Sequence, residues 1–226
     1  MLWVVAGIGV LLFALFLATR RAAVPAATSS PFRMPAPDPN VFMIRGFDFY
    51  ARLDPERRVP MLESVRSAVA GRGTVYDQGS HAVVLWHDFH PPEQLLEGLS
   101  RDLPTQVIWL SFQKQVDAFE YVRWEGGTRL RHLVFGCYEK ERTWERVEGE
   151  PEPWEAAAIF DVARLERRLA SSEALSPESR TTPEEAARLR ALWRERRLLV
   201  DSSEPGIEAR DVAEAVAIAH GLPGWR

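Results

Sequence analysis

Residues 116–135 read VDAFEYVRWEGGTRLRHLVF, and this stretch decides the fold class. Two runs rich in β-branched and aromatic residues flank the pair Gly126-Gly127. Glycine adopts positive φ angles at little cost, and two such residues in succession favour the tight turn of a two-residue β-hairpin. The stretch therefore predicts two antiparallel strands, 116–124 and 128–135, inside a larger sheet.

Pairing outward from the turn assigns the two faces of this hairpin. If Glu125 pairs with Thr128, one face carries six side chains and is expected to face the core: Phe119, Tyr121, Arg123, Leu130, His132 and Val134. The opposite face then carries Glu120 and Arg131 in diagonal positions, where a charge pair is expected.

The residues before the hairpin predict the element order β-α-β-β-α-β. Strands are expected at 41–50, 74–76, 81–86 and 105–112, with helices opened by Pro60 and by Pro91-Pro92. The first helix carries an apolar stripe formed by Met61, Leu62, Val65 and Val69. In element order alone this resembles the split βαβ arrangement of ferredoxin-like folds, which host many unrelated functions.

The residues after the hairpin predict one more strand at 143–147 and then a helical extension, 151–226, packed on the sheet domain 41–150. A single helix is expected from Pro153, with a stripe formed by Trp154, Ala158, Val162, Leu165 and Leu169. Thr182 and Glu185 form a capping box for a second helix, and a last helix is expected at 207–220. The predicted fold class is α+β: a mixed or antiparallel sheet with helices on one face.

The N-terminal residues predict a membrane anchor. Residues 2–18 carry no charge and, at about 1.5 Å per helical residue, nearly cross a hydrocarbon core of about 30 Å. Arg20 and Arg21 follow the run, which predicts a retained single-pass helix (1–21) with contact to lipid through 2–19 and the C-terminal domain in the cytoplasm. A signal peptide cleaved near 24–26 is the alternative. Prolines at five positions make 22–40 a semi-extended linker.

The composition of the chain bears on its partners and on the role of its single cysteine. The net charge of −4 gives no field that would attract nucleic acid, so no nucleic-acid partner is expected. Cys137 is the only cysteine, which excludes an intrachain disulfide. As a lone cysteine it is interpreted as a small buried hydrophobe rather than a nucleophile.

The best candidate for chemistry is the group His81, His87, Asp88 and His90, because imidazole and carboxylate are ligands for Zn or Fe. On a straight strand, however, His81 and His87 would lie nearly 20 Å apart at about 3.3 Å per residue. The spacing therefore disfavours a shared metal. The alternative is that Asp88 or His90 caps the following helix. No catalytic residue, cofactor or metal is predicted, and His87, Asp88 and His90 remain weak metal candidates.

Together these features predict a membrane-tethered domain that acts in protein–protein interaction near the inner face of a bacterial-type membrane. The alternative is a metal-dependent enzyme that uses the segment His81–His90.

Overall fold

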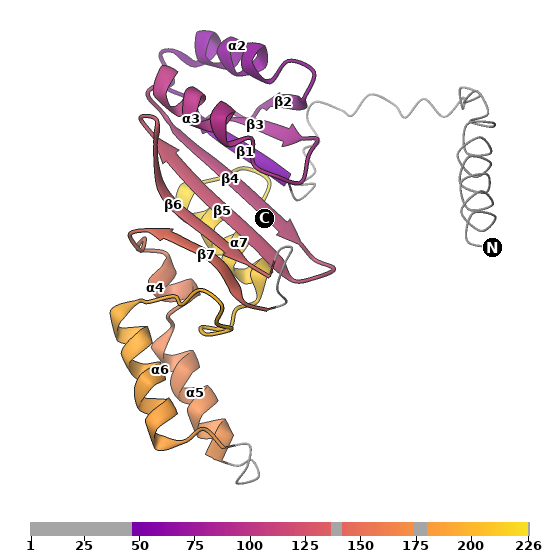
Figure 1. The fold of residues 1–226 in the computed structure, drawn as a ribbon. Helices are drawn as coiled ribbons and strands as arrows, with labels where there is room; N and C mark the ends of the chain where they lie inside the picture. The colour runs from indigo at the N-terminus through magenta and orange to yellow at the C-terminus, as the bar shows by residue number, and fades with distance from the viewer. Residues whose placement is uncertain (1–46, 137–141, 174–179, 226) are drawn as a thin grey trace, which may run out of the picture. The chain divides into compact units, whose positions relative to one another are not determined.

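The computed structural model describes residues 47–136, 142–173 and 180–225 (Figure 1). They form an α+β fold built on one seven-stranded antiparallel sheet, in the order β2-β3-β1-β4-β5-β6-β7. Its strands are β1 (Phe47–Arg52), β2 (Gly73–Asp77), β3 (His81–Trp86), β4 (Gln106–Gln113), β5 (Ala118–Glu125), β6 (Thr128–Phe135) and β7 (Trp144–Gly149). The helices are α2 (Arg58–Val69), α3 (Glu93–Asp102), α4 (Glu155–Ala158), α5 (Val162–Glu173), α6 (Pro183–Glu195) and α7 (Ala209–His220).

Helices α2 and α3 cover one face of the sheet (Figure 1). The stripe predicted for the first helix is confirmed, because the buried residues of α2 are Met61, Leu62, Val65 and Val69. They pack in one core with strand residues that include Phe49, Trp109 and Trp124.

Helix α7 packs on β4 and β5 from the opposite face, so the expectation of helices on one face only is wrong. Val212 and Val216 of α7 join a second core with Ile108 and Tyr121 of the sheet. The central strands explain this arrangement: five consecutive residues of β4, from Val107 to Ser111, are buried without alternation, and the first four are apolar. A continuous apolar run of this kind requires cover on both faces.

The turn of the predicted hairpin is confirmed, but its register is not. Gly126 and Gly127 both have positive φ, and Glu125 pairs with Thr128. A β-bulge then inserts Leu130, so that Arg123 faces Arg131. Every later residue of β6 therefore lies on the face opposite to the predicted one, because side chains alternate along a strand.

The predicted pair between Glu120 and Arg131 is consequently wrong. Arg131 forms a buried ion pair with Glu155 at 2.7 Å on the α7 side of the sheet. Glu120 lies on the other side and contacts His132. The bulge, which the spacing of hydrophobic residues does not reveal, separates the two charges.

The single helix expected from Pro153 is two helices, α4 and α5. Ile159 and Phe160 between them are buried, and the Asp161 carboxylate accepts a hydrogen bond from Ala163 N at 2.9 Å. This side-chain acceptor starts a new helix in place of continuing the old one. The capping box that starts α6 is confirmed, with both reciprocal bonds between Thr182 and Glu185.

Residues 1–46 lie outside the described residues, and with them the predicted anchor, the linker and the first part of the strand expected at 41–50. Cys137 lies outside them too. Within the described ranges, no helix combines the length and the apolar character needed to cross a bilayer.

Candidate functional site: a histidine–carboxylate cavity on the sheet

A cavity of about 440 Å³ opens on the α3 side of the sheet, over β5, β6 and β7. Its lining comes from strands β5 and β6, from the edge strand β7, and from the start of α3 with the connection that leads into it. The lining residues are His90, Pro91, Glu93, Glu120, His132, Val134, Glu145 and Arg146. We call this the β5–β7 cavity.

A chain of hydrogen bonds holds two of the buried lining side chains in place. Trp109 Nε1 donates to one oxygen of Glu120 at 3.0 Å, and His132 Nε2 lies 3.1 Å from the other oxygen. A carboxylate only accepts hydrogen bonds, so Nε2 of His132 is the donor in this contact. In the uncharged form of the ring, Nδ1 is then an acceptor. That atom is buried and has no hydrogen-bond partner in the structure.

The bulge at Leu130 is what brings these groups together. Without it, His132 would share a face with Tyr121. With it, His132 pairs with Val122 and so lies on the same face as Glu120. Trp109 also pairs with Val122, from β4, which sets its indole beside the Glu120 carboxylate.

Ion pairs connect the rim of the cavity. Arg129 bridges Glu93 of α3 and Glu148 of β7, at 3.1 and 2.7 Å. The Arg146 guanidinium lies 4.0 Å from Glu93 and 3.8 Å from Glu148. These pairs tie α3 to the edge of the sheet and keep the two walls of the cavity at a fixed separation.

Of the four residues singled out from the sequence, only His90 lines this cavity. His87 and Asp88 are exposed in the connection between β3 and α3, where Asp88 accepts a hydrogen bond from Phe89 N at 2.7 Å. The expected cap is wrong, since the N-cap of α3 is Pro92 and no side chain bonds there.

His81 lies on the other face of the sheet, which it shares with Val83 of the α7-side core, two residues further along β3. It is buried, and Ser80 Oγ lies 2.9 Å from its Nδ1. Burial and the charges of Arg52 and His220 lower the pKa of His81 to about 4. In the described part of the chain, no three His, Cys, Asp or Glu side chains are grouped so that they could hold a metal ion.

Sequence reasoning missed His132 and Glu145 as site residues. His132 was expected on the core face with Tyr121, because a bulge leaves no mark in the alternation of β6. Glu145 falls in the strand predicted at 143–147, which the structure has as the edge strand β7, but no feature of the sequence places that strand beside His132. Gly149, the last residue of β7, pairs with Arg131 next to the bulge, and a glycine inside a strand is the local feature that hints at the irregularity.

A second polar cluster lies on the opposite face, where α7 ends against β5. The Glu152 carboxylate is the common acceptor of Tyr121 Oη (2.9 Å), Trp154 Nε1 (2.7 Å) and Arg123 Nε (2.6 Å), and His220 Nε2 lies 3.3 Å from it. Burial opposes its ionisation, but these hydrogen bonds and the Arg123 charge outweigh burial and hold the pKa of Glu152 at about 2. The cluster fixes the end of α7 to the sheet.

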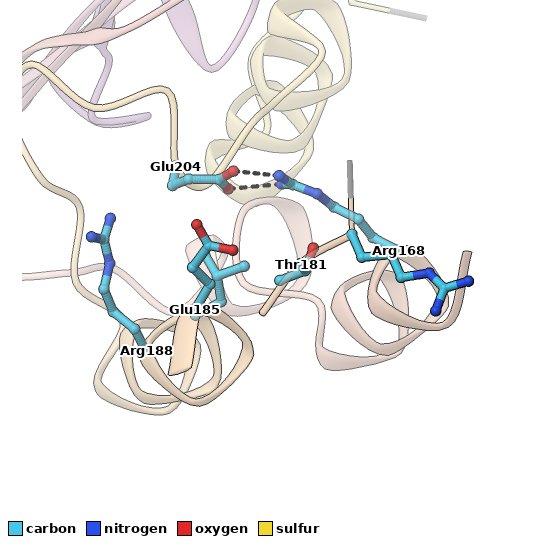
Figure 2. Close-up of a pocket in the computed structure, with 7 residues that line it drawn as sticks. Arg168, Thr181, Glu185, Arg188 and Glu204 are labelled. Atoms are coloured by element: carbon cyan, nitrogen blue, oxygen red, sulfur yellow. Dashed lines mark hydrogen bonds and ion pairs between the residues drawn. The ribbon is translucent and has the colours of Figure 1, made fainter. Parts of the chain in front are cut away.

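Figure 2 shows a third polar region, a cavity of about 360 Å³ lined by α5, α6 and Glu204. Arg168 donates to both oxygens of Glu204. Glu185 accepts the hydrogen bond of Thr182 N at 2.8 Å as part of the α6 capping box. The charged groups of this cavity thus serve the packing of the helical pair, and it is a weaker candidate than the β5–β7 cavity.

Comparison of the chain with protein-family models, with curated proteins and with solved structures found no match.

Proposed function

We propose that this chain is a membrane-tethered domain that acts by binding a protein partner near the membrane surface. The observation that carries the binding role is the β5–β7 cavity, whose lining includes a buried imidazole, His132, oriented by Glu120. Pockets of several hundred Å³ with a few convergent polar groups are where proteins usually bind other molecules. Its position next to a β-bulge also fits a binding role, since bulges are enriched beside functional sites.

The membrane part of the proposal rests on the sequence. Residues 2–18 form an uncharged apolar run, and Arg20 and Arg21 follow it, a charge distribution that favours the cytoplasmic side for the domain. The proline-rich segment 22–40 would act as an extended spacer between the bilayer surface and the domain.

We also propose that β1-α2-β2-β3-α3-β4 is a ferredoxin-like unit. Its support is the order of the elements along the chain and the strand order β2-β3-β1-β4 within the larger sheet. This scaffold carries no inference about activity.

A metal-dependent enzyme is the second candidate, and one observation favours it. His90 and His132 line the same cavity, and Glu120 orients His132 as outer carboxylates orient the histidine ligands of zinc. Elemental analysis of the purified chain separates the two candidates. We expect no stoichiometric Zn, Fe or Mn. One ion per chain that is lost in both His90→Ala and His132→Ala would favour the enzyme.

Site-specific photocrosslinking in cells tests the binding role. A benzoylphenylalanine at Arg146, on the rim of the cavity, should crosslink one discrete partner in the membrane fraction. The same probe at Glu63, on the exposed side of α2, is the matched control and should not. Equal products from both positions, or recovery of the chain from the soluble fraction, would contradict the proposal. The partner identified in this way should then bind the purified chain.

A further inference from the structure

We propose that the β5–β7 cavity receives an arginine side chain of the protein partner. This inference rests on the proposed function and names the chemistry that the partner must bring. It follows from three properties of the cavity: the charge of its walls, the free acceptor among its lining side chains, and its size.

The walls favour a cation. Glu93, Glu120 and Glu145 line the cavity, whereas Arg146 is the single arginine among the lining residues. Arg129 and Arg146 pair with Glu93 on the rim, so the surplus negative charge rests on Glu120 and Glu145. A guanidinium carries only donors, five N–H groups in a planar fork, and carboxylates are its preferred acceptors. An anionic ligand would instead meet three carboxylates.

The buried imidazole favours a hydrogen-bond donor. His132 is only 1% exposed, and its Nδ1 has no hydrogen-bond partner. Its Nε2–H is already given to Glu120, so Nδ1 of the uncharged ring offers a lone pair. Nδ1 is covered in this structure, so an entering donor reaches it when the His132 ring or its cover shifts, and the new bond then removes the cost of a buried acceptor without a partner.

The size and geometry distinguish arginine from a bare ion. A metal needs several ligands within about 2.0–2.6 Å, and no three suitable side chains are so grouped in the ranges that the structure describes. A cavity of about 440 Å³ accommodates a whole side chain. Arginine spans separated acceptors through its planar fork better than the point charge of lysine, and it is enriched among the residues that dominate protein interfaces.

The test uses the full chain in detergent micelles, labelled with ¹⁵N at histidine and tryptophan. The probe is the tripeptide acetyl-Gly-Arg-Gly-amide, and its citrulline counterpart is the matched control, with the same shape but no charge. We expect saturable shifts of the His132 and Trp109 side-chain resonances with the arginine peptide, and binding at least about tenfold weaker with citrulline, as for loss of a charge-assisted bond.

Two variants locate the binding site. Glu145→Gln should weaken arginine binding about tenfold, and Glu93→Gln provides a second test should the first variant unfold. Glu97→Gln is the control, because Glu97 is an exposed acid of α3 that pairs with Arg101 outside the cavity, and its variant should bind like the unaltered chain.

Equal binding of arginine and citrulline peptides would overturn the inference. So would unchanged affinity in both cavity variants, or no shift at peptide concentrations on the order of 10 mM. These failures leave the crosslinking result intact, so they are distinguishable from failure of the proposed function. Conversely, specific arginine binding without any crosslinked partner would count against the proposed function alone.

Discussion

Glu152→Gln is the most informative perturbation of the fold, because this carboxylate ties α7 to the sheet. Four side chains surround it, and the closest donor is Arg123 Nε at 2.6 Å. Glutamine keeps the shape of the side chain but removes its charge. It also sets an amide NH₂ group against a donor wherever the amide nitrogen replaces a carboxylate oxygen.

The expected loss follows from the pKa. The folded chain holds the pKa of Glu152 at about 2, against an ordinary value of 4.5. At about 1.4 kcal/mol per pKa unit, the ionised form contributes about 3 kcal/mol to the free energy of unfolding. Because the folded pKa is the lower one, this contribution is complete above pH 4.5. It declines as the pH falls and is lost near pH 2.

Urea unfolding followed by tryptophan fluorescence measures this difference, and Trp154 reports directly from the cluster. Glu152→Gln should cost about 3 kcal/mol at pH 7 and progressively less between pH 4.5 and 2. Glu166→Gln is the matched control, since Glu166 pairs with Arg190 at the surface and its removal should have a far smaller effect. A deficit in Glu152→Gln that does not shrink with acidification would refute the electrostatic explanation.

Three further stability changes can be measured by the same unfolding assay. Replacing Gly126 and Gly127 together by Val should cost about 2–4 kcal/mol, because both residues have positive φ, whereas Gly98→Ala inside α3, where a Cβ meets nothing, should be neutral or stabilising. Gly149→Ala should cost at least about 2 kcal/mol, because its φ is +80° and a Cβ would overlap the carbonyl of the bulged Leu130; an unchanged stability would mean that the bulge can relax. Thr182→Ala should cost about 1 kcal/mol by removing the cap of α6, and a cost near zero would show that the cap is dispensable.

Much of the fold could be predicted because local rules determine it. Local sequence determines three of its features: the stripe of α2, the strand 81–86 and the capping box of α6. Each depends on residues that are close together in the sequence. Two features could not be predicted in this way. The cover of both sheet faces depends on where α7 returns, more than 80 residues after β5. The break between α4 and α5 depends on the burial of Ile159 and Phe160, which tertiary packing decides.

Less of the candidate site than of the fold could be predicted from the sequence, because most of its residues meet only through strand pairing. His90 was found because it belongs to a local group of histidines, whereas His132 and Glu120 become neighbours only through strand pairing. Prediction of that pairing failed at Leu130, where one additional residue reverses the direction of every side chain that follows it. An error of one position in the register therefore put His132 on the wrong face of the sheet while leaving the turn correct.

The bulge at Leu130 places Arg131 and His132 on opposite faces of the sheet, in different chemical surroundings. On the α7 side, Arg131 donates to both oxygens of Glu155 and to the carbonyls of Glu148 and Gly149, so four hydrogen bonds within the chain hold its guanidinium. On the α3 side, the bulge leaves His132 with one ring nitrogen engaged and the other without a partner. An unbulged hairpin would instead place Arg131 beside Glu120, where the expected charge pair would close the cavity with the chain's own cation. Because of the bulge, the Arg131 guanidinium lies outside the β5–β7 cavity. We propose that the partner supplies a guanidinium to this cavity.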